Sequence, residues 1–269
     1  MLNLKIAKKQ QIKVFSDQKK TPEKSADLIF KGSSEDFIKC LAREVLSHEA
    51  INHEYLYKLR NATFKNKKLI LRDYAFQYSH YSKGFTIYLK NVVQRLSNKK
   101  HKDILMENYY EELGKPNADK FEDWPHKKMF NAFAEEVGVN TEYKKNNELC
   151  FTTKIWKELF DEKCKSNLPG VGLGAIGLAT EFIVPHIYSS ILGTIKAEKS
   201  LSKRCAYFFE LHTDCDIEHG LEILKCCEEE ATNSATREGI RFGAISSLNL
   251  RKVFWDVMLA RANNLENLE

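Results

Sequence analysis

The stretch FFELHTDCDIEHGLEIL, residues 208–224, carries the pattern from which the fold of this chain can be worked out. It places His212, Asp216 and His219 at positions i, i+4 and i+7, and a helix of about 3.6 residues per turn brings all three side chains to one face. Imidazole and carboxylate groups gathered in this way are typical metal ligands. The alternative is a solvated acidic helix face, because Asp214, Glu218 and Glu222 lie nearby.

Helical periodicity continues from this stretch in both directions. Apolar residues at three- and four-residue spacing predict long helices at about 174–196, 200–231 and 233–263. Turn signals such as GKPNAD separate three shorter helical blocks, at about 101–113, 126–137 and 149–164.

The upstream part of the chain is also helical in pattern. Ser34 is a candidate N-cap for one or two helices that end before Lys68, and residues 68–96 predict a central, largely buried helix with Gly84 inside it. No segment alternates apolar and polar residues as a half-buried strand would. The sequence therefore predicts an all-α protein, a single bundle of about seven helices.

Length and composition suit one soluble domain. The 269 residues are 43% hydrophobic and 29% charged, and we expect a helical domain over residues 34–269 after a partly ordered N-terminal arm, residues 1–33. The 42 basic and 37 acidic residues are interspersed, which predicts no nucleic-acid partner. The seven cysteines do not have the spacing of a disulfide framework, and the sequence shows no secretory signal. No apolar run is judged long enough for a membrane helix. We therefore predict a cytoplasmic protein without a membrane partner.

Two other helices offer metal ligands. Asp73 and His80 lie seven residues apart on one face of the predicted central helix, among Leu, Phe and Tyr. Glu181 is the sole acidic residue in a long uncharged run, where a carboxylate without a partner would be costly. Each has an alternative: a satisfied core histidine at His80, and a hydrogen bond to a neighbouring helix or a cap at Glu181.

Two further features rank lower. His186 follows Pro185 and is a candidate ligand or a hydrogen-bond donor to one. Gly172, Gly174 and Gly177 spell the dinucleotide-binding pattern G-x-G-x-x-G, but no strand precedes it. We interpret these glycines as a flexible entry to a closely packed helix.

These residues resemble the haem-oxygenase-like di-iron oxidases and oxygenases, which are related in fold to the PqqC and TenA proteins. Their motif H-x3-D-x2-H stands here as His212, Asp216 and His219. The resemblance, which covers about residues 60–230, implies six ligands to two irons. One iron would lie near Asp73, His80 and His212, and the other near Glu181, Asp216 and His219.

A second block of the resemblance is NYYEELGKPNADKFEDWPHKKMFNAFAEEVGV, residues 108–139, in which Glu112, Gly114 and His126 match the family pattern. We do not assign these residues as iron ligands from the sequence. The chain departs from the family at the first carboxylate, where many members have Glu and this chain has Asp73, or else Gln77 in its place. The shorter arm or neutral amide would hold a cation less firmly.

The resemblance also implies the chemistry: two Fe(II) ions, with manganese possible at one site, O2 as co-substrate, an electron donor and a small organic substrate. Family members oxygenate amines, cleave carbon-carbon bonds in amino acids or fatty acids, and in the chlamydial CADD type make para-aminobenzoate from one of their own tyrosines. Two alternatives stay open: a cofactor-free oxidase of the PqqC kind, and a helical binding protein without catalysis. The aromatic residues Phe254 and Trp255 predict a core or homodimer face in the last helix, and we expect a homodimer.

Overall fold

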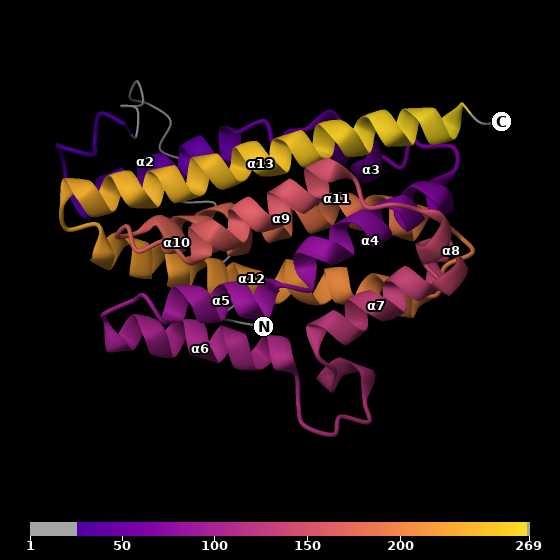
Figure 1. Cartoon of the computed structure of the whole chain (residues 1–269), viewed down its shortest axis with the longest axis horizontal. Helices are drawn as coiled ribbons and strands as arrows, with labels where there is room; N and C mark the ends of the chain where they lie inside the picture. Colours follow the sequence, from indigo (N-terminus) through magenta and orange to yellow (C-terminus); the bar gives the residue numbers. More distant parts are fainter. Residues whose placement is uncertain (1–25, 268–269) are drawn as a thin grey trace.

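The computed structural model describes residues 26–267, together with every side chain in that range except those of residues 214–217. The region described is helical, with no strand in it, as the sequence predicts (Figure 1). Most of the arm predicted for residues 1–33 lies outside the described residues.

The helices follow the predicted blocks closely. In chain order they are α2 (Ser34–Ser47), α3 (Glu54–Arg60), α4 (Lys67–Ser82), α5 (Phe85–Val93), α6 (Lys99–Leu113), the 3-10 turn η1 (Phe121–Asp123), α7 (His126–Glu136), α8 (Thr141–Asn146), α9 (Phe151–Cys164), α10 (Val171–Leu173), the π-helix η2 (Gly174–Glu181), α11 (Val184–Ala197), α12 (Lys203–Glu230) and α13 (Ser234–Glu266).

The expected count of seven helices is not confirmed, because the chain divides several of the predicted helices. The segment 68–96 becomes two helices, α4 and α5, with a break at Lys83 and Gly84. A side chain at Gly84 would meet the hydroxyl group of Tyr88 at 2.5 Å, so this position is kept free for the tyrosine to pack against the backbone. The periodicity of the segment does not reveal this local contact.

The layers are built around the run from α10 through η2 to α11. This run packs between the two longest helices, with α13 on one side and α12 on the other, while α5 and α6 form a hairpin below them (Figure 1). At Gly174 an added side chain would lie 2.0 Å from the carbonyl oxygen of Ile240 in α13. Glycine is therefore required there by the close approach of two backbones, as expected for a closely packed helix.

The same run, Val171–Ala197, is long and apolar enough to cross a membrane by length and composition, contrary to our estimate from the sequence. However, 89% of its most apolar window is buried inside the protein. A helix covered on all sides by its own protein has the composition of a core helix.

Aromatic side chains fill the core between α4, α9 and α13. The rings of Tyr81 and Trp156 stack with centroids 4.0 Å apart, and Trp156 also contacts Phe254 at 4.6 Å. Tyr78 and Tyr81 lie on the face of α4 that looks into the bundle. This face therefore forms one wall of the site described next.

Candidate metal centre

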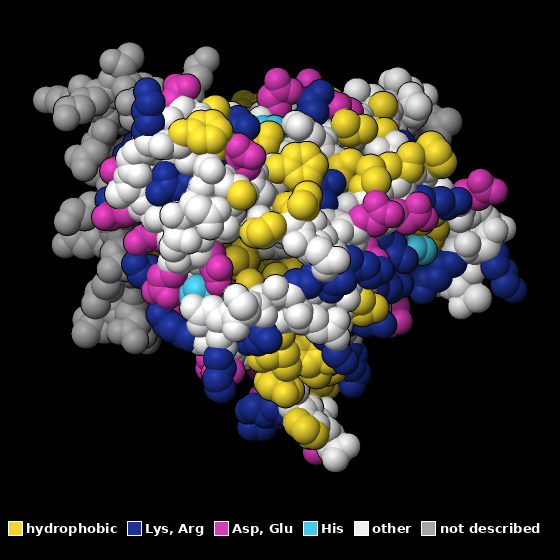
Figure 2. Space-filling view, turned by 60° about the vertical axis from the view of Figure 1, so that its left-hand side comes forward, with side chains coloured by type: hydrophobic (Ala, Val, Ile, Leu, Met, Phe, Trp, Pro, Cys, Tyr) yellow, Lys and Arg dark blue, Asp and Glu magenta, His cyan; other side chains and the backbone are white. Residues whose placement is uncertain are grey.

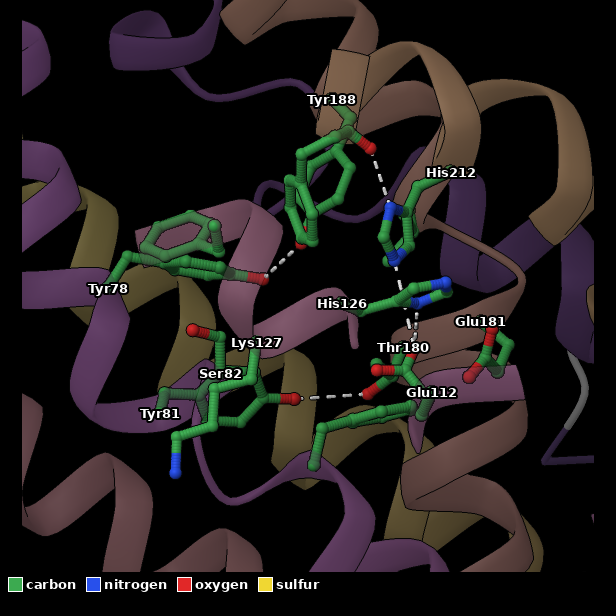
Figure 3. Close-up of a pocket in the computed structure, with 14 residues that line it drawn as sticks. Tyr78, Tyr81, Ser82, Glu112, His126, Lys127, Thr180, Glu181, Tyr188 and His212 are labelled. Carbon is green, nitrogen blue, oxygen red and sulfur yellow. Dashed lines mark hydrogen bonds and ion pairs between the residues drawn. The ribbon is translucent and has the colours of Figure 1, made fainter. Parts of the chain in front are cut away.

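Three side chains from three helices converge inside the bundle. They are Glu112 at the end of α6, His126 at the start of α7 and His212 in α12, and one ligand atom from each lies within 4.8 Å of the others (Figure 3). Nδ1 of His126 is 2.9 Å from Oε1 of Glu112, and Nε2 of His212 is 3.7 Å from the same oxygen. One carboxylate and two imidazoles at this spacing could hold a metal ion.

A turn in the backbone brings Glu112 and His126 together. Gly114 ends α6 with a φ of 65°, and an added side chain there would lie 2.5 Å from the backbone nitrogen of Pro125. The amide of Lys115 donates to the carbonyl oxygen of Asp123, which closes the loop. The chain therefore returns to start α7 at His126 beside the helix it has just left.

The orientation of His212 is set by its own helix. Its Nδ1 lies 2.6 Å from the carbonyl oxygen of Phe208, so Nδ1 carries a proton and donates it to that oxygen. When the ring is neutral its lone pair is on Nε2, and this atom lies 3.7 Å from Oε1 of Glu112. The ring also packs edge-on against His126 and Tyr188, with centroids 4.5 Å and 5.6 Å away.

Electrostatics keep Glu112 ionised. Burial by itself raises the pKa of this carboxyl group, but the charge and hydrogen bond of His126, with a smaller contribution from His212, outweigh it and hold the pKa well below the ordinary value. A partly buried carboxylate in this state is a ready ligand for a cation.

Glu181 lies in the same pocket at the end of the π-helix η2. It is 3% exposed, and its Oε1 accepts a hydrogen bond of 3.0 Å from Asn108 of α6. The wider winding of the π-helix is marked by the bond from the amide of Phe182 to the carbonyl oxygen of Gly177, five residues earlier. Such segments occur often at functional sites.

The pocket around these groups is mostly aromatic. The centres of water-sized spheres can occupy about 40 Å³ of it, room for an ion or a few water molecules, and the whole empty space, open solvent included, is about 480 Å³. Besides the four groups already named, it is lined by Tyr78, Tyr81, Ser82, Phe85, Lys127, Phe130, Thr180, Val184, Tyr188 and Phe208 (Figure 3).

Residues 72–252 match the family described as iron-containing redox enzymes, which has a haem-oxygenase-like fold. The chain belongs to this iron-containing redox enzyme family. The segment matched contains Glu112, His126, Glu181 and His212, the groups that the structure gathers in one pocket.

Individual relatives agree with this family. The chain is 26% identical over 187 residues to the 4-aminobenzoate synthase of Chlamydia pneumoniae, an alignment that covers 69% of this chain and 79% of the relative. Among solved structures, a TenA homologue from Pseudomonas syringae has a TM-score of 0.67 at 14% identity, with 91% of this chain and 98% of that one covered. A CADD-like protein of unknown function from Nostoc punctiforme has a TM-score of 0.64 at 19% identity, covering 84% and 98%. The two structures show the fold.

In this member of the family, the motif formed by His212, Asp216 and His219 divides between the pocket and its outer side. His212 lines the pocket, whereas Nε2 of His219, about two turns further along α12, lies 2.8 Å from Oε2 of Glu111. The side chain of Asp216 lies outside the described residues.

The structure does not bring Asp73 and His80 to the pocket, since neither is among the residues that line it. Both carboxylate oxygens of Asp73 bind Arg261 of α13, at 2.6 Å and 2.8 Å. His80 is half-buried on the other side of α4, where burial and then the nearby lysines, Lys83 first, lower its pKa. Gln77, the alternative to Asp73, is likewise engaged elsewhere, because its Oε1 accepts from the amide of Cys150.

The reason is the rotation of α4 about its axis. Asp73 and His80 lie on one stripe of the helix, and the neighbouring stripe, which carries Tyr78 and Tyr81, is the one that faces the pocket. His186, a lower-ranked candidate, is also absent from the pocket lining.

The family pattern in the sequence includes Glu112 and His126, but they were not predicted to be ligands. The sequence pattern that could have identified them is Glu112, then Gly114 two residues later, then His126 at the start of the next helix.

Proposed function

We propose that this protein is a non-haem di-iron oxidase or oxygenase that uses O2 to oxidise a small organic substrate. The observation that carries the proposal is the convergence of Glu112 and His126, both partly buried, with the buried His212, and Glu181 lies in the same pocket. The family match and the haem-oxygenase-like fold support it.

The residues fit iron chemically. Imidazole nitrogens and carboxylate oxygens together suit iron or manganese, and a site of this kind differs from the closed four-ligand sites that zinc favours. In the proposal Glu112, His126 and His212 hold one ion. Glu181 and His219 hold the second, together with Asp216 on the strength of its place in the motif.

When bound, iron supplies the ability to bind and reduce O2, which amino-acid side chains lack. The chain supplies the geometry. The carbonyl oxygen of Phe208 fixes the tautomer of His212, and Asn108 fixes the rotamer of Glu181. Such outer partners normally raise metal affinity by keeping the ligands in place.

The walls of the pocket exclude water and offer exchangeable protons. The phenol oxygens of Tyr78 and Tyr188 lie 3.1 Å apart, and the Tyr188 ring packs against His212 (Figure 3). The hydroxyl group of Tyr81 lies 3.3 Å from that of Thr180, beside Glu181. These phenols are placed to hold a proton next to the site while aromatic rings keep bulk solvent out.

The test is anaerobic reconstitution with Fe(II), followed by iron analysis and addition of O2. We expect about two irons per chain and a change in the absorption spectrum on O2 addition. The variants H126A and H212A should lose iron while circular dichroism shows unchanged helicity. Less than one iron per chain in the wild type, with no spectral response, would favour the cofactor-free PqqC-like alternative or a binding protein.

A second candidate is formation of 4-aminobenzoate, favoured by the similarity to the chlamydial 4-aminobenzoate synthase. Tyrosines Tyr78, Tyr81 and Tyr188 line the pocket, so phenol rings are available beside the ligands. Iron-loaded protein exposed to O2, a reductant and ammonium as the nitrogen source, without added organic substrate, would then release 4-aminobenzoate detectable by mass spectrometry. No product above that of the H212A variant would leave oxidation of a free substrate as the function.

A further inference from the structure

Arg251 of α13 is buried directly behind one wall of the pocket. Its side chain is 1% exposed, whereas Figure 2 shows, on one face of the molecule, how Lys and Arg side chains stand out from the surface. The guanidinium group lies over the rings of Tyr81 and Trp156, at 5.4 Å and 5.1 Å from their centroids. Tyr81 lines the pocket, so a single side chain separates Arg251 from it.

The charge of Arg251 is not balanced by an acid. Among the described side chains of residues 26–267, none of the ion pairs includes Arg251, and its Nη1 has no hydrogen-bond partner there. Burying a charge is costly, and an arginine that served stability alone would be expected to pair with a carboxylate, as Arg261 pairs with Asp73. The position of Arg251 is better explained by what its other terminal nitrogen contacts.

Nη2 of Arg251 donates to the carbonyl oxygen of Ala179 in the π-helix η2, at 3.4 Å. This carbonyl group lies where the hydrogen bonds of the backbone change register. In an α-helix the amide of Ile183 would donate to Ala179, but here it donates to Thr180, at 3.1 Å. Pro185, near the start of α11, has no amide hydrogen to offer. Arg251 therefore supplies a donor from another helix at the break that ends η2.

A second link between Arg251 and η2 runs through Tyr81. Nη2 of Arg251 lies 3.3 Å from the hydroxyl oxygen of Tyr81, which in turn lies 3.3 Å from Oγ1 of Thr180 (Figure 3). Thr180 donates its own proton to the carbonyl oxygen of Ala175, so Tyr81 is the donor to Thr180 and Arg251 is the donor to Tyr81. These hydrogen bonds have one direction, from Arg251 into η2.

Both links hold the residues that come immediately before Glu181. Successive side chains are about 100° apart around an α-helix and closer together around the wider π-helix, so a change of winding at Ala179 and Thr180 would turn the Glu181 carboxylate. Asn108 holds that carboxylate only at its Oε1. The direction of Glu181 therefore depends on the backbone behind it as well as on Asn108.

We propose that Arg251 is a positioning residue for Glu181: from outside the pocket, its guanidinium group holds the π-helical turn that directs this carboxylate toward Glu112, His126 and His212. The inference rests on the proposed function for the identity of the ion that Glu181 would help to hold. The effect of Arg251 on η2 is a property of the metal-free chain, so it can be measured without iron.

The main variant is R251M, which removes the charge and the hydrogen bonds but keeps a long side chain in the core. R237M is the matched control, because Arg237 is also a buried arginine of α13 that donates to backbone carbonyl oxygens, among them those of Ala231 and Leu28, and it does not line the pocket. R251K keeps a charged donor at the same position. Thermal unfolding shows whether each variant is folded.

The first measurement is hydrogen exchange of the metal-free, full-length protein, followed by mass spectrometry. In R251M the amides of residues 178–184 should exchange about three- to tenfold faster than in the wild type, the change expected for the loss of one or two hydrogen bonds. R251K should restore part of the protection, and R237M should exchange as the wild type does in this segment. Y81F removes only the link through the phenol and should have a smaller effect.

The second measurement is iron content after anaerobic reconstitution. R251M should keep the ion held by Glu112, His126 and His212 and lose the other, so iron falls from about two to about one per chain, whereas R237M keeps about two. R251K should recover part of the loss. A residue that served only the stability of α13 would give the same result at both arginines.

Three results would overturn the proposal: wild-type exchange at residues 178–184 in R251M, equally faster exchange there in R237M, or faster exchange spread evenly over α4, η2 and α13. If R251M does not fold, R251K and Y81F are compared in its place, and wild-type exchange in both would overturn it. Faster exchange in R251M together with failed iron loading of the wild type would uphold the role of Arg251 in η2 and reject the di-iron proposal. Two irons in both proteins with unchanged exchange would do the reverse.

Discussion

Oε1 of Glu112 and Nδ1 of His126 lie 2.9 Å apart although the two residues belong to different helices. The contact depends on the turn that ends α6, where Gly114 has a φ of 65° and the backbone of Pro125 lies against it. A side chain at this position would be strained by its conformation and would collide with the backbone of residues 123–125. The loop, rather than either helix alone, therefore sets the distance between the two ligands.

The first prediction concerns this turn. Replacing Gly114 with Ala should lower the free energy of unfolding by about 1–3 kcal/mol, since a strained backbone conformation costs that much. It should also reduce iron retained after reconstitution, because His126 would move relative to Glu112. Chemical denaturation and iron analysis measure the two effects. K120A, in the same loop, serves as the control, and unchanged iron content in G114A would contradict this account.

The second prediction separates the metal site from a structural ion pair. E112Q removes the charge of the central carboxylate and should lower iron affinity at least about tenfold. Losing a group that only orients a ligand already costs about that much, and Glu112 is proposed to be a ligand itself. Helical content should be preserved. D73N, which removes a buried carboxylate bound to Arg261, should bind iron as the wild type does. Competition with a coloured chelator measures both affinities, and loss of iron in D73N would restore Asp73 as a candidate ligand.

The third prediction concerns how much the ion pair between Asp73 and Arg261 stabilises the fold. Asp73 is 2% exposed, and Arg261 is one-third exposed, so D73N leaves a partly buried guanidinium group without its partner. We expect unfolding to become easier by roughly 2–3 kcal/mol, below the usual range for a fully buried pair. Urea denaturation of D73N and of the double variant D73N/R261Q tests this. If the pair acts as a unit, the second change should add little to the first.

The fourth prediction is a pH dependence. Hydrogen bonds from His101 and Lys100 lower the pKa of Glu229 to about 2, below its ordinary value of 4.5. The ionised form is therefore favoured by folding, and its contribution to stability is present above pH 4.5 and is lost as the pH falls toward 2. E229Q should be less stable than the wild type at pH 7, with the difference shrinking below pH 4.5. E238Q is the control, and a constant difference across this window would contradict the prediction.

The sequence by itself determined the class of fold and the helix motif of His212, Asp216 and His219. Spacing at three and four residues predicts helices because one face of each must be buried, and the structure confirms an all-helical bundle with most of the predicted blocks. The isolated acid at Glu181 predicts a buried polar group, and the structure places it in the pocket. His212 is found there too. These features are local, because they depend on the spacing of residues within one helix.

Only the tertiary structure decided which stripe of each helix faces the pocket. Asp73 and His80 have the spacing of ligands, but the rotation of α4 turns Tyr78 and Tyr81 inward and leaves Asp73 to Arg261. That rotation is fixed by packing against α7, α9 and α13, none of which is visible in the periodicity of α4. Glu112 and His126 meet because a loop folds back on itself. The sequence therefore determined that ligand-type residues exist, and the packing of whole helices determined which of them share a site.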